Sequence, residues 1–160
     1  MQPQYQVQST WNNNSIFIAG NSQTNLFGGN QLIAGCEVIS YYDLDLTGNV
    51  IKELDGVYTR ILNKLNLTIN ELATNEQKAC VNSDAEDAIL YIVDSGFVSS
   101  TGNGRLVRKT IAGLAYIYPL GQQDLQTTHY RPLLIATDNN NTIEGRQLNR
   151  RTDFWAYPIR

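Results

Sequence analysis

Residues 32–65, LIAGCEVISYYDLDLTGNVIKELDGVYTRILNKL, contain the two clearest secondary-structure patterns in this sequence. The first part, 32–42, is rich in β-branched and aromatic residues and predicts a strand. Thr47 then stands where a helix N-cap is expected. Apolar residues follow at helical spacing and predict a helix from about 48 to 65: Val50, Leu54, Val57, Tyr58, Ile61 and Leu65.

The same patterns continue toward the C-terminus. The stretch 66–86 is compatible with a broken helix or with an inserted excursion. Further elements follow in chain order: a central strand at 88–93 buried on both faces, a helix at about 105–118, a strand at 126–136 that Pro132 makes an edge or a bulge, a short helix at 142–149 and a last strand at 152–159.

This order predicts an α/β (α+β) sandwich, βαβαβ(α)β, with two helices packed on one mixed sheet of about four strands. We expect one domain over 36–160 and see no internal repeat. Residues 1–35 differ in composition, because glutamines alternate with apolar residues and Asn12-Asn13-Asn14 follows. They predict an extended, amide-rich N-terminal arm with short strands that adds to the edge of the domain or to a neighbouring chain; a solvated linker is the alternative.

Composition excludes several classes of partner. The chain has 160 residues, of which 42% are hydrophobic and 17% charged, while 17 Asn and 11 Gln supply much of the polarity. A net charge of −3 with only four lysines argues against nucleic acid or an anionic membrane as partner, because phosphate binding needs clustered cations. No apolar run approaches the ~18 residues of a membrane span. No secretory signal is visible, so either export does not use that route or the signal was removed.

The sequence is poor in residues for catalysis or metal binding. Cys36 and Cys80 are the only cysteines, and they are either two buried thiols or one disulfide, which would imply an oxidising compartment. His129 is the only histidine and lies in a strand-like stretch, where a packed or surface role is more common than general-base catalysis. We therefore expect no enzyme activity, no metal site and no cofactor.

A resemblance emerges near the C-terminus. The segment 125–154 contains Leu125-Gln126-Thr127-Thr128-His129-Tyr130 and then Asn141-Thr142-Ile143-Glu144-Gly145-Arg146, followed by Asn149-Arg150-Arg151 and Asp153-Phe154. This segment resembles the end of the OmpA-like domain, the peptidoglycan-associating module of OmpA, Pal and MotB. A looser match extends over roughly 36–158.

The resemblance implies non-covalent binding of the peptidoglycan stem peptide by an acid and a cation. Asp94, at the end of the 88–93 strand, corresponds to the family's ammonium-binding aspartate, and Arg108 or Lys109 corresponds to its carboxylate-binding arginine. A turn role for Asp94, in which it bonds local backbone N–H groups, is the alternative.

A charge cluster follows, formed by Glu144, Arg146, Asn149, Arg150 and Arg151. Cationic side chains and an Asn suit the C-terminus of the expected 142–149 helix. We interpret the cluster as structural, holding that helix on the sheet.

Two functions follow from these observations. The first is a non-catalytic module of the periplasm or cell envelope that binds peptidoglycan. The second is a structural or assembly protein of a virion, tail or secretion complex that uses a similar scaffold for protein–protein contacts. In either case the N-terminal arm is a candidate for homo-oligomer contacts, and the partners are peptidoglycan or protein subunits.

Overall fold

The computed structural model describes residues 15–16, 24–26, 29–34, 38–123 and 128–147. This part of the chain consists of β-strands and one short 3-10 helix, η1 (Glu86–Ala88), without any α-helix. None of its helices has the length and apolar character needed to cross a membrane.

Most of the strands form two sheets of predominantly parallel strands. Sheet A contains, in spatial order, β1 (Ser15–Ile16), β3 (Gln31–Ala34), β5 (Ile51–Asp55), β7 (Glu71–Ala73) and β10 (Phe97–Ser99). Sheet B contains β16 (Asn141–Gly145), β11 (Arg105–Thr110), β8 (Lys78–Val81), β6 (Thr59–Thr68), β4 (Ile39–Leu46) and β2 (Thr24–Leu26), with β9 (Ile89–Tyr91) also paired to β6.

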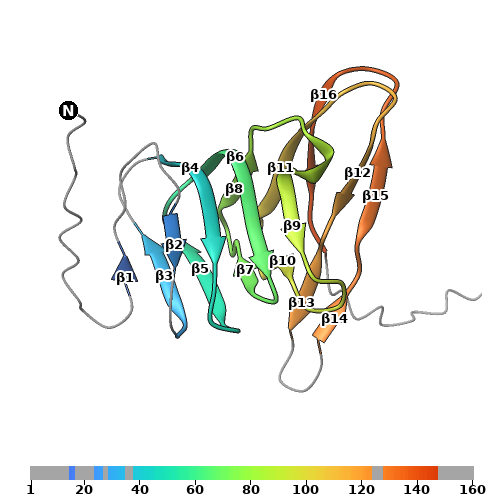
Figure 1. Ribbon diagram of the computed structural model, residues 1–160. Helices are drawn as coiled ribbons and strands as arrows, with labels where there is room; N and C mark the ends of the chain where they lie inside the picture. The colour runs from blue at the N-terminus through green and yellow to red at the C-terminus, as the bar shows by residue number, and fades with distance from the viewer. Residues whose placement is uncertain (1–14, 17–23, 27–28, 35–37, 124–127, 148–160) are drawn as a thin grey trace, which may run out of the picture.

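The chain winds as a β-solenoid, alternating between the two sheets. From β2 to β8, even-numbered strands lie in sheet B and odd-numbered strands in sheet A, so each coil gives one strand to each sheet. Ile39 pairs with Thr59 and Thr59 with Ala79, 20 residues apart, while Leu44 pairs with Leu65, 21 residues apart, so equivalent positions in these coils recur every 20 or 21 residues. Figure 1 shows the coils stacked side by side from the blue N-terminal strands toward the C-terminal hairpin. Coils stacked in this way can bury their apolar residues only against their neighbours.

Apolar side chains stack in rows between the two sheets. In sheet B, Leu44 pairs with Leu65 and Leu65 with Ile89, and all three are buried. From sheet A, Ile33 and Leu54 form a second buried pair in register. Each coil therefore continues the core of the one before it.

A β-bulge in β6 changes which positions face this core. Tyr41 pairs with Ile61, but Asp43 pairs with Lys64, so one extra residue stands on the β6 side. The Asp43 carboxylate accepts hydrogen bonds from Asn63 Nδ2 at 2.7 Å and from the Lys64 backbone N–H at 3.0 Å. These bonds satisfy groups that the interrupted ladder leaves without a strand partner.

The spacing of apolar residues explains why the predicted helix at 48–65 is wrong. Ile61 and Leu65 both face the core, and their spacing of four is even, so it places two residues on one face of a strand as well as on one face of a helix. Leu54 and Val57 are separated by three because a turn at Gly56, with φ of 67°, lies between β5 and β6. The resulting spacing imitates a helical stripe, although β5 and β6 are extended.

The other two predicted helices are also wrong, so the expected α/β sandwich is contradicted. Residues 105–118 form β11 and β12 (Ala115–Tyr118), joined by a turn in which Gly113 has φ of 80°. Residues 141–145 form β16, which pairs antiparallel with β11. The expectation that the chain lacks an internal repeat is corrected by the sheets, where Leu44-Asp45-Leu46-Thr47 aligns with Leu65-Asn66-Leu67-Thr68.

Several strand predictions hold in part. Residues 89–91 form a strand, but it is not buried on both faces, because Leu90 is 40% exposed. The 66–86 stretch contains strands and an excursion ending in η1. Pro132 separates β14 (Thr128–Tyr130) from β15 (Leu133–Ala136). The described pieces of the predicted arm, β1 to β3, add strands to the two sheets, and the predicted strand at 152–159 lies outside the described residues.

A C-terminal hairpin covers the end of the stack. β12 pairs with β15, and β13 (Gly121–Gln123) pairs with β14, both antiparallel. The base of the hairpin lies on Phe97 of sheet A, where a Cβ on Gly121 would come within 2.6 Å of the Phe97 ring. On sheet B, β16 covers the edge of β11. The last coil is thus closed by the base of the hairpin on sheet A and by β16, the strand that follows the hairpin, on sheet B.

The row packing predicts the effect of a core truncation. Leu65→Ala removes a fully buried side chain between two stacked neighbours, and we expect it to lower the free energy of unfolding by about 2–5 kcal/mol. Leu62→Ala in the same strand is the control, because Leu62 is 38% exposed and its loss should change stability by only about 0.5 kcal/mol. Urea denaturation of both variants measures the difference, and equal losses would contradict the inward row.

Candidate functional site

Arg108, a predicted ligand residue, is buried inside the last coil. Its side chain continues the inward row of sheet B next to Val81 and is only 1% exposed. The guanidinium donates to three backbone carbonyl oxygens, those of Ile117 at 2.9 Å, Ala85 at 2.9 Å and Glu86 at 3.3 Å.

Two tyrosine rings complete the surroundings of Arg108. Its guanidinium carbon lies 4.7 Å from the ring centre of Tyr116 and 5.8 Å from that of Tyr118. The contacts fit a cation–π arrangement in a desolvated place. Burial lowers the pKa of Arg108 below its ordinary value, but an arginine remains charged. Arg108 therefore joins the 82–88 excursion and the hairpin to the last coil, and its burial separates it from any ligand at the surface.

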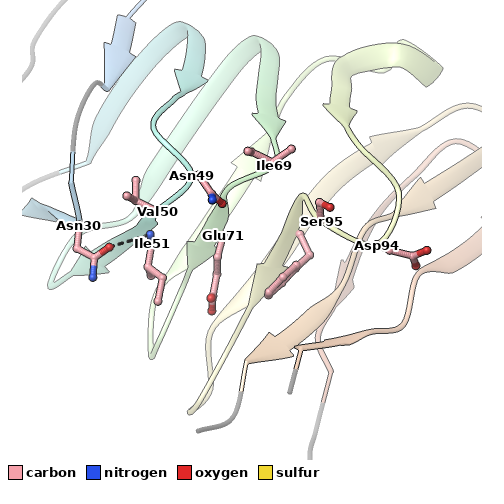
Figure 2. Close-up of a pocket in the computed structure, with 9 residues that line it drawn as sticks. Asn30, Asn49, Val50, Ile51, Ile69, Glu71, Asp94 and Ser95 are labelled. Carbon is pink, nitrogen blue, oxygen red and sulfur yellow. Dashed lines mark hydrogen bonds between the residues drawn. The ribbon is translucent and has the colours of Figure 1, made fainter. Parts of the chain in front are cut away.

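A depression among the described residues lies instead at the turns where the strands of sheet A begin. It has a volume of about 610 Å³. Figure 2 shows its lining residues at the turns where the sheet A strands begin. They are Asn30, Asn49, Val50, Ile51, Ile69, Glu71, Asp94, Ser95 and Phe97. This groove contains one of the sequence-predicted ligand residues, Asp94, but neither Arg108 nor Lys109.

Glu71 is the buried acid of the groove. It is 9% exposed and stands in register between Ile51 and Phe97 of the neighbouring strands. Ser99 Oγ donates to Glu71 Oε1, while Oε2 has no hydrogen-bond partner. Burial is the main reason that the pKa of Glu71 lies above its ordinary value. Glu71 could not be recognised from the sequence, because a glutamate at the start of a strand is not part of any motif that indicates a binding site.

Asp94 occupies the opposite end of the groove. It is exposed, with φ of 64°, in the turn that follows β9. In Figure 2 its carboxylate points away from Glu71, so the two acids do not form a pair. None of the nine lining residues is cationic. The groove thus offers separate carboxylate, amide and apolar contacts, which suit a polar or cationic group without supplying a catalytic arrangement.

Asparagine side chains hold the coils together beside the groove. Asn70 Oδ1 accepts from the Val50 N–H at 3.0 Å, and its amide nitrogen donates to the Leu46 and Leu67 carbonyl oxygens at 2.8 and 2.9 Å. Asn30 makes an equivalent bond to the Ile51 N–H at 3.1 Å. These amides join backbone groups of neighbouring coils. Asn70 is the last residue of the Leu-x-Leu-Thr-x-Asn pattern that recurs at 44–49 and 65–70.

Lys52 is a second buried cation in the scaffold. It points into the core from β5 and is 0% exposed. Its Nζ donates to Gln31 Oε1 at 2.6 Å and to the Gly29 carbonyl oxygen at 2.8 Å. Burial lowers the pKa of Lys52 to about 8. Lys52 is therefore a structural group of the first coils and was not singled out by the sequence.

The predicted charge cluster is found on strands rather than at a helix end. Glu144 on β16 pairs with Lys78 and lies 3.9 Å from Arg105 Nε, while Arg146 donates to the Gly102 carbonyl oxygen at 2.7 Å. These contacts tie the closing strand to β8 and β11. Asn149, Arg150 and Arg151 lie outside the described residues, so their role stays a prediction.

Lys109, Cys80 and His129 complete the predicted candidates. Lys109 is exposed on β11, next to the buried Arg108. Cys80 is a buried free thiol, and burial raises its pKa; Cys36 lies outside the described residues, so a disulfide between them stays a prediction. His129 lies in β14, opposite Gln122. Within the described part of the chain, no group of three or more His, Cys, Asp or Glu residues is placed to hold a metal ion.

Comparison with family models, with curated proteins and with solved structures finds no match to this chain. The resemblance to the OmpA-like domain thus rests on the motif alone, and its central residues Asn141–Gly145 form a strand here. Any statement about function must come from the geometry itself.

The contacts of Arg108 predict a stability effect. Arg108→Ala removes the hydrogen-bond partner of three partly buried carbonyl groups and the packing of a buried side chain, and we expect it to lower the free energy of unfolding by about 2–4 kcal/mol. Lys109→Ala is the matched control and should be nearly neutral, because that side chain is exposed. Thermal and urea unfolding compare the two variants. An Arg108→Ala protein as stable as the Lys109→Ala protein would show that the guanidinium does not support the last coil.

The pKa of Lys52 predicts a dependence of stability on pH. The folded-state pKa of about 8 lies below the ordinary lysine value, so between these values the unfolded chain binds more protons. The contribution of Lys52 to stability should therefore rise with pH across this interval. Lys52→Met removes the titrating group. The difference in unfolding free energy between wild type and this variant then reports on Lys52 alone, because the tyrosines and cysteines titrate in both proteins. A difference that stays constant with pH would show that the Lys52 pKa is unchanged by folding.

Proposed function

We propose that this chain is a non-catalytic structural or assembly protein that works through protein–protein contacts on a β-solenoid scaffold. The single observation that carries this proposal is the burial of Arg108 within the scaffold. The cation that the sequence offered for a ligand is enclosed by three carbonyl groups and two tyrosines. The described buried cations thus support the scaffold, and the surface is left for contacts.

The exposed apolar side chains support the same proposal. Large apolar side chains that are exposed on strands and turns are typical of interaction surfaces when they form a contiguous patch. Several are in the C-terminal half, around β9 and on β15. The complete set with exposed fractions above about a third is Val38, Tyr42, Leu62, Ile69, Leu90, Ile92, Val93, Ile117, Leu133 and Leu134.

Peptidoglycan binding is the second candidate, and one observation favours it. Asp94 is exposed in a groove of about 610 Å³ whose lining has carboxylates and amides but no cation. A carboxylate in this setting suits the ammonium group of a stem peptide. The carboxylate-binding partner would then be Lys109 or another group, since Arg108 is enclosed.

A photo-crosslinking experiment tests the assembly function. A photoreactive amino acid is placed at Ile92 or at Leu134, both exposed and apolar, and at Asp55 as an exposed polar control. In the cells or particles that naturally contain this chain, we expect protein adducts from Ile92 or Leu134 and not from Asp55. The absence of adducts at both apolar positions would contradict the proposal.

Retention by purified sacculi tests the competing function. We expect no saturable retention of the wild-type protein. The opposite result would be saturable retention that is lost in Asp94→Ala and kept in Asp84→Ala, the exposed-acid control. That result would establish peptidoglycan binding through the groove and would overturn the assembly function.

A further inference from the structure

Strand β15 is an open edge in the described part of the chain. It pairs with β12 on one side and with no described strand on the other. Figure 1 places it at the outer side of the C-terminal hairpin, away from the stacked coils. An edge of this kind presents unpaired backbone N–H and C=O groups that can accept another strand.

Two flanking hydrogen bonds show which backbone groups point outward. The Arg131 N–H donates to the Leu120 carbonyl oxygen at 2.8 Å, and the Thr137 carbonyl oxygen accepts from the Gly113 N–H at 2.9 Å. Odd-numbered residues of this segment therefore direct their N–H and C=O groups toward β12. In an antiparallel ladder these directions alternate, so Leu134 and Ala136 direct theirs to the open edge.

The side chains at this edge are apolar. Leu133 is 46% and Leu134 65% exposed, and Leu134 lies opposite Ile117 of β12, which is 39% exposed. β15 contains no charged residue and no bulge, which are the usual devices that stop one edge from pairing with another. Only Pro132, just before the strand, lacks an N–H group.

We propose that β15 pairs antiparallel with β15 of a second copy of this chain. The hairpins of the two copies then form one continuous sheet about a two-fold axis, an isologous interface. This interface rests on the proposed assembly function and names one of its partners as the chain itself.

The directions of the backbone groups select one register. With Leu134 opposite Ala136 of the second copy, the N–H of each donates to the C=O of the other, and the two-fold axis repeats both bonds. Ile135 then faces its own symmetry mate. This register satisfies every outward group of Leu134 and Ala136, and Pro132 falls beyond the bonded residues. Moving the register by two residues one way would place Ala136 opposite Pro132, which cannot donate, and moving it the other way would place Leu134 opposite Asp138, beyond the end of β15.

Charges at the two ends of β15 fit this antiparallel arrangement. Arg131 precedes the strand and Asp138 follows it, and both are exposed. Neither forms an ion pair within the described residues. In the selected register, Arg131 of one copy lies opposite Asn139 of the other, and Asp138 of that copy is one residue away on the other face of the sheet, so the two opposite charges attract across the interface without a direct ion pair. A parallel arrangement would instead bring like charges together.

Sedimentation equilibrium of the full chain over a wide concentration range tests the interface. We expect a reversible monomer–dimer equilibrium. Ala136→Pro removes only an outward N–H, so the hairpin should keep its fold, as checked by circular dichroism, while dimerisation weakens by about tenfold or more. Asp55→Ala, an exposed change on β5 away from β15, is the control that should leave the dimer intact.

Charge reversal gives the second readout. Arg131→Glu and Asp138→Arg should each weaken dimerisation by about tenfold at low salt, because like charges across an interface repel. The double variant carrying both changes restores opposite charges and should recover most of the affinity.

The possible results separate the interface from the proposed function. A wild-type chain that stays monomeric, or a dimer that neither Ala136→Pro nor charge reversal weakens, would overturn the β15 interface. If Leu134 or Ile92 still forms adducts with another protein in the natural source, the assembly function stands without it. If those adducts are also absent, both proposals fail.

Discussion

Hydrogen bonding between coils is the constraint on which the rest of this structure depends. Each strand of the solenoid is too short to be stable alone, and its partners come from positions one coil earlier and one coil later. The pairing fixes a repeat of 20 or 21 residues, so that Ile39, Thr59 and Ala79 stand in one row and Leu44 and Leu65 in another. Once the rows are aligned, leucines stack on leucines inside, and Asn70 joins the backbone of adjacent coils at the corner.

The same constraint explains why charged groups are found in the core. In sheet B, the inward position next to Val81 on the last parallel strand is taken by Arg108 rather than by another leucine. The carbonyl groups of the 82–88 excursion and of β12 are not part of the sheet ladder there, and the guanidinium satisfies them. In sheet A, Lys52 does the same for the Gly29 carbonyl oxygen. Both residues satisfy carbonyl groups of segments that the regular repeat does not pair.

Individual residues show how far the sequence could be interpreted. Local composition predicts three features that are present in the structure: a strand at 89–91, an interruption of the strand at Pro132 and a turn at Asp94. The helix predicted at 48–65 fails because a spacing of four, as between Ile61 and Leu65, also fits one face of a strand, and because the turn at Gly56 adds a spacing of three. The groove could not be predicted, since Asn30, Glu71 and Asp94 come from three different coils and meet only through the register.

The sequence by itself determined the local chemistry of this protein: strand-forming segments, amide-rich turns, few cations, and apolar residues sufficient for a core. Tertiary structure alone decided which side of each strand faces inward, because parity depends on bulges and on the register with the neighbouring coil. It therefore also decided that Arg108 is enclosed while Lys109, one residue later, is exposed. It left β15 at an open edge for the same reason, since an edge exists only in relation to the strands beside it.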